Sequence, residues 1–191
     1  MTPADLDAIR ARIQRAFQSA KDARGSGYET SYQASGTDFT TNFRAIDVKA
    51  PEQLEDDFLN LFVWVWSLKD YLKETFEARG LSGKHVEKEV NCCTPLTYVA
   101  DIANRAKHGT LRDSRSGKFA TLVDVGFEAP QETIEKIVFG GPSVTLHVKN
   151  PEMIRVHATV LISSGERIDA LTVLDEAMSC WESRVIAVIA A

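Results

Sequence analysis

The stretch PEQLEDDFLNLFVWVWSLKDYLKETFEAR, residues 51–79, decides the fold of this chain. Pro51 suits the first turn of a helix, and Gly80 suits the position just after its end. Apolar residues recur between them at three- and four-residue spacing, and aromatic residues add apolar surface on other sides. The residues of the repeating stripe are Leu54, Phe58, Leu61, Val65, Leu68, Leu72 and Phe76. We therefore expect one long central helix that neighbouring elements bury on several faces.

Further helices are expected on both sides of this central helix. Residues 3–21 repeat apolar side chains at helical spacing, and a short helix is expected after the turn at Ser82 and Gly83. Thr94 followed by Pro95 is typical of a helix start, so a helix is expected from about Pro95 to Leu111. Asp169 is a candidate N-cap for a last helix that runs towards the C-terminus.

Strands are expected between these helical parts. Residues 119–127 alternate in the manner of a strand, and TIEKIVF (133–139) is a further candidate. VTLHVK (144–149) and IRVHATVLI (154–162) flank Asn150 and Pro151, which predicts an antiparallel hairpin.

Residues 24–50 show no helical period and are rich in Gly, Ser, Thr, Tyr and Asn. This composition predicts a long loop that holds at most a short strand.

The order of elements predicts an α+β fold, in which a helical bundle of about four to five helices holds an inserted antiparallel sheet of about three to four strands. The chain of 191 residues is long enough to bury one core, so we expect a single domain over residues 1–191. Its helical part is expected at 1–112 plus 169–191, with a strand-rich insertion at 113–168.

Charge and hydropathy restrict the classes of partner. The formal net charge of −5 argues against a dominant electrostatic attraction to nucleic acid or to an anionic membrane, and it leaves room for a local basic patch. The longest apolar run, residues 58–68, is too short to span a membrane. The N-terminal MTPADLDAIRARIQRAF lacks the apolar core of a signal peptide.

The chain has three cysteines, an odd number, and the neighbours Cys92 and Cys93 are poorly placed to bridge each other. We therefore expect reduced cysteines in a cytoplasmic protein without a disulfide framework.

One polar cluster stands out in DIANRAKHGTL, residues 101–111. On a helical wheel, Asp101, Asn104, Arg105 and His108 fall within an arc of about 100°, opposite the side expected to pack. One interpretation is a solvated face with an Asp101–Arg105 ion pair. The other is a face covered by RNA or a second protomer, where Arg binds a phosphate and His transfers a proton.

Asp70 is a candidate neighbour of this cluster. It lies on the central helix, most of which is expected to be buried, and a buried carboxylate needs a partner. Arg105, Lys107 or His108 can supply that partner if the two helices pack side by side. The alternative is that Asp70 marks the point where the helix emerges into water.

Two long helices, the second ending in Arg105 and His108 with Asn104 and Asp101 close by, resemble the HEPN superfamily of helical bundles. That resemblance covers the helical parts and implies a dimeric, RNA-binding or RNA-cleaving protein of a bacterial toxin or defence system. The family motif is an Arg followed, after a longer spacer, by a His. Here only Ala106 and Lys107 separate Arg105 from His108.

The remaining histidines and cysteines suggest no metal site. His147 and His157 are expected across from each other on the predicted hairpin, where exposed cross-strand histidines are commoner than metal ligands. Cys92 and Cys93 with His85 and His108 would be an unusual zinc set. No P-loop, dinucleotide glycine fingerprint, nucleophile elbow or H-E-x-x-H motif is present, so no cofactor is expected.

Two functions follow from these patterns. The favoured one is a non-catalytic interaction or oligomerisation module, in which Asp70, Asp101, Asn104, Arg105 and His108 form a structural polar network. The alternative is a HEPN-like RNA-binding or RNA-cleaving domain, with His108 as acid and base, Arg105 on phosphate, and Asn104 and Asp101 orienting them. A homodimer and RNA are thus the expected partners, with no DNA and no membrane.

Overall fold

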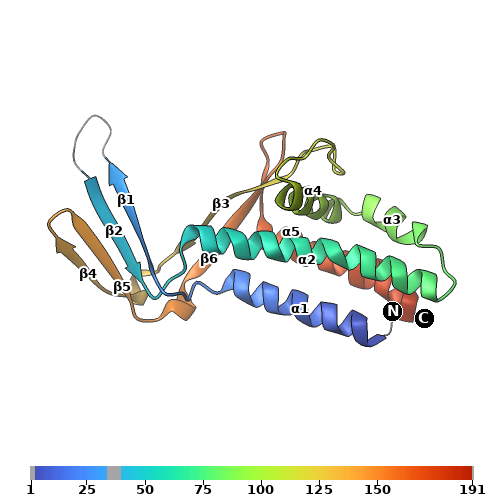
Figure 1. Cartoon of the computed structure of the whole chain (residues 1–191), viewed down its shortest axis with the longest axis horizontal. Coiled ribbons are helices and arrows are strands. Elements are labelled where there is room, and N and C mark those ends of the chain that lie inside the picture. Colours follow the sequence, from blue (N-terminus) through green and yellow to red (C-terminus); the bar gives the residue numbers. More distant parts are fainter. Residues whose placement is uncertain (1–2, 34–39, 191) are drawn as a thin grey trace. The chain divides into compact units, whose positions relative to one another are not determined.

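The computed structural model describes residues 3–33 and 40–190 and confirms the α+β fold (Figure 1). The chain is 52% helical, and its strands form one sheet of four and one of three. The helices are α1 (Pro3–Lys21), α2 (Pro51–Ala78), α3 (Lys84–Asn91), α4 (Thr94–His108), α5 (Ala170–Cys180) and α6 (Ala187–Ala190), with a π-helical segment, Trp181–Ile186, between the last two. The strands are β1 (Tyr28–Gln33), β2 (Thr40–Ile46), β3 (Thr121–Glu128), β4 (Ile134–Gly140), β5 (Ser143–Val148), β6 (Arg155–Leu161) and β7 (Arg167–Asp169).

The chain forms two compact units, each of which has its own core. The first comprises Met1–Ser19, Asp57–Asp124 and Ala158–Ala191, and the second comprises Ala20–Asp56 and Val125–His157. The single domain expected over residues 1–191 stays a prediction.

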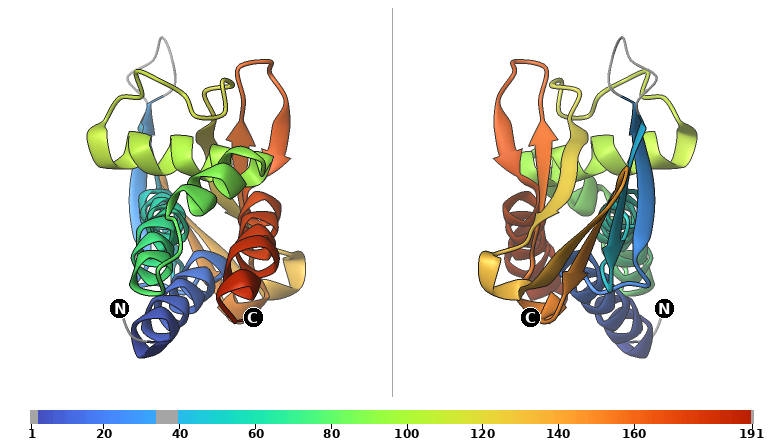
Figure 2. Two further views of the ribbon diagram at one scale, coloured as in Figure 1. Left: turned by 90° about the vertical axis from the view of Figure 1, so that its right-hand side faces the viewer. Right: turned by 90° about the vertical axis from the view of Figure 1, so that its left-hand side faces the viewer.

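The expected central helix is confirmed as α2. In the first unit, α1, α4 and α5 surround it (Figures 1 and 2). Phe58, Leu61, Val65 and Leu68 are fully buried, as the all-round apolar pattern requires. Trp181, also fully buried, donates its indole N–H to the Val65 carbonyl at 3.2 Å, which ties the C-terminal helical segment to α2.

The second unit contains the sheet β1-β2-β5-β4. β1–β2 and β4–β5 are antiparallel, whereas β2 and β5 are parallel. A small apolar core lies against this sheet. Its buried members are Ala23, Ala45, Val48, Val148 and Ile154.

The prediction of a loop at residues 24–50 is wrong over much of its length, because this segment contains β1 and β2. Most residues of β1 are exposed, so this edge strand lacks the apolar alternation that identifies a strand in sequence. Its aromatic Tyr28 packs at 6.1 Å, centroid to centroid, from Phe43 of β2. Residues 34–39 of the expected loop lie outside the described residues.

The expected hairpin of residues 144–149 with 154–162 is also wrong. β5 pairs with β4 and β2, whereas β6 belongs to the sheet β3-β6-β7. A 3₁₀ turn at Pro151–Met153 follows β5, where a hairpin turn was expected. His147 and His157 therefore lie on strands of different sheets and do not face each other across a hairpin.

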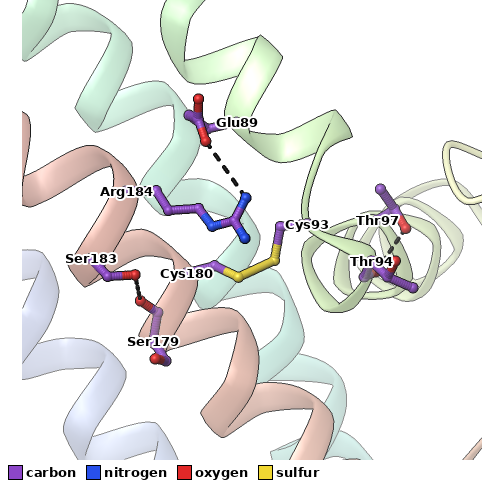
Figure 3. The surroundings of a disulfide bond; sticks show 8 residues. All are labelled: Glu89, Cys93, Thr94, Thr97, Ser179, Cys180, Ser183 and Arg184. Carbon is purple, nitrogen blue, oxygen red and sulfur yellow. Dashed lines mark hydrogen bonds and ion pairs between the residues drawn. A yellow bond between two sulfur atoms is a disulfide. The ribbon is translucent and has the colours of Figure 1, made fainter.

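The structure also corrects the expectation about the cysteines. Cys93 and Cys180 form a disulfide across 87 residues, and Cys92 is free and exposed (Figure 3). The pairing joins the residue before α4 to the last residue of α5, a proximity that sequence spacing cannot reveal. Among the described helices, none is long and apolar enough to cross a membrane.

The start of α5 gives a test of local stability. The carboxylate of Asp169 accepts hydrogen bonds from the backbone N–H and the hydroxyl of Thr172, at 2.7 and 2.9 Å, which confirms the predicted N-cap. We expect Asp169→Ala to lower the free energy of unfolding by about 1 kcal/mol, measured by urea denaturation. Asp175→Ala, at an exposed position within the same helix, should change it by less than half as much. Equal effects would contradict the capping role.

Candidate functional site

The polar cluster predicted at the end of α4 divides into a buried and an exposed part. The middle of the helix is buried, from Leu96 to Ala103, and Asp101 is fully buried with it. Asn104 and Arg105 are half-buried, and His108 is exposed. The expectation that all four polar residues share one face away from the packing side is therefore wrong for Asp101.

Asp101 holds the loop that follows α4. Its carboxylate accepts hydrogen bonds from the hydroxyls of Ser114 and Ser116, both at 2.6 Å. It also accepts from the backbone N–H of Arg115 at 2.7 Å and of Ala120 at 3.3 Å. Hydrogen bonds to a carboxylate are stronger than those between neutral groups, and these four offset the cost of burying the charge.

The two serines extend this hydrogen-bond network further along the loop. Ser114 Oγ accepts the N–H of Phe119 at 3.0 Å, and Ser116 Oγ accepts the N–H of Lys118 at 2.9 Å. The Lys118 carbonyl accepts the N–H of Ser163 at 2.8 Å. Asp101 thus determines the path of the backbone from residue 114 to residue 120.

α4 ends at His108, three residues earlier than expected, because the chain turns at Gly109. This glycine has φ 73°, a left-handed conformation that favours Gly, and its N–H donates to the Arg105 carbonyl at 2.8 Å. The early end exposes Lys107 and His108 and turns the chain back towards Asp101.

Arg105 does not form the predicted ion pair with Asp101. No ion pair joins these two side chains in the described part of the chain, because the Asp101 carboxylate is occupied by the loop. The Nε of Arg105 is buried and has no hydrogen-bond partner among the described residues.

Asp70 does not join the cluster. Its side chain is 66% exposed, and its ion pair is with the adjacent Lys69, at 3.5 Å. The alternative interpretation, in which Asp70 marks where the central helix meets water, fits this position.

A second polar centre, which sequence reasoning missed, lies beside the loop. Glu87 of α3 pairs with Arg115 at 2.8 Å, Lys73 at 3.1 Å and Lys69 at 3.6 Å. Lys69 and Arg115 also lie over the ring of Trp66, at 4.6 and 5.2 Å from its centroid. This network joins α2, α3 and the loop around one carboxylate.

Burial by itself would raise the pKa of Glu87, but hydrogen bonds from Arg115 and Lys73 and the charge of Lys69 lower it to about 2. The only signal of this centre in the sequence is the four-residue spacing of Lys69 and Lys73, which places both on one face of α2. The contribution of Arg115 depends on the fold of the loop.

The Lys and Arg side chains at the end of α4 and in the loop, together with His108, are what we call the cationic surface. It comprises Arg105, Lys107, His108, Arg112, Arg115 and Lys118. Arg115 pairs with Glu87, and Lys118 donates to the Tyr98 hydroxyl at 3.0 Å. By contrast, Lys107, His108 and Arg112 are exposed and form no ion pair within residues 3–33 and 40–190.

This arrangement differs from the one that the RNA-cleaving hypothesis requires. Within the described ranges, no group of three His, Cys, Asp or Glu residues is placed to hold a metal ion. Asp101, which the RNA-cleaving hypothesis assigned to orient Arg105 and His108, is engaged by the loop.

Searches against protein-family models, curated proteins and solved structures found no match to this chain.

The role of Asp101 is testable by an isosteric change. Asp101→Asn keeps the shape of the side chain but removes its charge and half of its acceptor capacity. We expect the free energy of unfolding to fall by about 2 to 4 kcal/mol, because buried donors of the loop lose their partner. Trypsin should then cut faster after Arg115 and Lys118. The matched control is Asp113→Asn, an exposed change of equal charge in the same loop. If both variants were equally stable, the anchoring role would be wrong.

The lowered pKa of Glu87 predicts how the free energy of unfolding depends on pH in acid. Because folding lowers its pKa from 4.5 to about 2, its ionised form stabilises the native state above pH 4.5. That stabilisation is lost as the pH falls from 4.5 to about 2. Wild type should therefore exceed Glu87→Gln in free energy of unfolding at pH 6, and the difference should shrink over this interval.

Glu74→Gln, an exposed change of the same kind on α2, serves as the control and should have little effect at pH 6. A difference between wild type and Glu87→Gln that stays constant down to pH 2 would refute the network.

Proposed function

We propose that this protein is a non-catalytic interaction module that binds through the cationic surface. The observation that carries the proposal is the complete burial of Asp101, whose four hydrogen bonds all come from its own chain. A carboxylate used in this way orders a loop and is not free to orient Arg105 and His108. Its effect is to present Lys107, His108 and Arg112 to solvent.

The charge of this region supports an anionic partner. Residues 105–118 contain five Lys and Arg residues and one Asp, a formal charge of +4. The whole chain has −5, so the other residues together have −9. Opposite charges on two surfaces raise the rate of association and suppress wrong partners.

The same chain supplies a candidate anionic surface at the start of α2. Glu52, Glu55 and Asp56 are exposed there, and Asp57 follows them. The partner we propose is therefore a second copy of this chain, whose start of α2 docks on the cationic surface. Such a contact is head-to-tail and repeats in each added copy.

Self-association should depend on salt and on the cationic surface. We expect sedimentation velocity to detect association at low ionic strength that weakens as salt rises, because exposed charges are screened. Lys107→Glu with Arg112→Glu should weaken it by about tenfold or more. Lys84→Glu with Lys88→Glu makes the same charge change on exposed residues of α3 and should keep association near wild type. A chain that stays monomeric at every salt concentration would contradict the proposal.

RNA binding is the second candidate function, with the HEPN resemblance and its bacterial toxin or defence context as its premise. The exposed Lys107, His108 and Arg112 favour phosphate contacts, and Phe119, 44% exposed, offers a ring for base stacking. Fluorescence anisotropy with a labelled single-stranded RNA separates the two candidates. Binding that is lost in Lys107→Glu with Arg112→Glu, from a chain that does not self-associate, would favour RNA. RNA cleavage that is lost in His108→Ala would overturn the non-catalytic assignment.

A further inference from the structure

The Cys93–Cys180 disulfide joins the start of α4 to the end of α5 (Figure 3). Its two cysteines differ in exposure, because Cys93 is only 2% exposed whereas Cys180 is half-buried. A thiol in solution therefore reaches Cys180 more easily. The two ends of the bond also differ in electrostatic environment.

Cys93 is the N-cap of α4, a helix of 15 residues, with extended backbone angles and no hydrogen bond from its side chain to the helix. The first turn of a helix leaves backbone N–H groups free, and its dipole places partial positive charge there. The partial positive charge favours a thiolate at this position, whereas the burial of Cys93 opposes it and Pro95 in the first turn has no N–H to donate. Reduction of the bond would place Cys93 in that position.

One cation belongs to the surroundings of this bond. Arg184 follows Cys180 by about one helical turn, and Figure 3 draws it among the residues around the disulfide. It also pairs with Glu89 of α3 at 3.8 Å. The charged groups drawn around the disulfide are thus one cation, which favours a thiolate, and one carboxylate, which opposes it.

We propose that Cys93–Cys180 is a thiol–disulfide exchange site whose co-reactant is a dithiol, and not a permanent cross-link. One thiolate of the dithiol attacks Cys180 Sγ, a mixed disulfide forms, and Cys93 Sγ leaves as a thiolate. The second thiolate then attacks the first sulfur of the dithiol and releases Cys180. Two electrons pass from the dithiol to the protein bond, and its two protons end on Cys93 and Cys180.

A thiol–disulfide exchange site is consistent with the cytoplasmic location expected from the sequence, and that location stays a prediction. Permanent disulfides are rare in a reducing compartment, where those that exist are mostly catalytic or redox-sensing. Reduction would remove the covalent link between the start of α4 and the end of α5. The inference stands independently of the proposed function, because it uses no residue of the cationic surface.

The test uses the full chain with Cys92→Ser, so that only the paired cysteines report. Native protein is equilibrated with mixtures of reduced and oxidised dithiothreitol, free thiols are alkylated and counted by mass spectrometry, and circular dichroism monitors folding. We expect reduction of both cysteines while the protein remains folded. Arg184→Gln should require about three- to tenfold more reductant relative to oxidant, and Arg184→Lys should match wild type.

Reduction that occurs only together with unfolding would show a structural cross-link and overturn the proposal. An equal reductant requirement for Arg184→Gln and Arg184→Lys, combined with a Cys93 thiol whose ionisation Arg184→Gln does not change, would also overturn it. Ionisation is followed by thiolate absorbance in Cys92→Ser with Cys180→Ser. We expect Arg184→Gln to shift formation of the Cys93 thiolate to higher pH, because the guanidinium favours the charged form.

Discussion

The middle of α2 has apolar side chains on nearly every side, so no single neighbour can remove it from water. Burial of a large apolar side chain contributes about 1.5 to 3 kcal/mol, and several such residues line this helix. The first unit satisfies the requirement with α1, α4 and α5 around α2, and Trp181 extends the contact to the C-terminal segment. The position of α4, and hence of every candidate site residue on it, follows from this packing.

Asp101 is a polar residue inside this core, and its carboxylate orders the loop that covers it. Once the loop after α4 folds back over it, its carboxylate lies out of reach of water and must find donors within the chain. The loop after α4 supplies four of them, and the loop is ordered in return. Arg115 then reaches Glu87 and Trp66, so one buried charge organises contacts with α2 and α3.

Much of the helical part was predictable, because periodicity and capping are local properties. The spacing in α2 and the N-cap at Asp169 both appear in the structure as expected. The edge strand β1 was missed because its exposed polar residues give no alternation. Of the candidate site, the exposure of His108 could be inferred from the sequence, whereas the burial of Asp101 could not. The helical wheel gave the correct position of Asp101 around its helix. Whether that side of the helix is exposed to water depends on the loop after α4, which folds back over it.

The sequence by itself determined the α+β class, the central helix and the concentration of positive charge at residues 105–118. These follow from the order of side chains along the chain, which periodicity and counting can read. Tertiary structure alone decided that Cys93 meets Cys180, that Glu87 gathers three cations, and that β5 pairs with β2 rather than β6. Each of these contacts joins residues far apart in sequence, and the packing of whole elements brings them together, a constraint that no local pattern records.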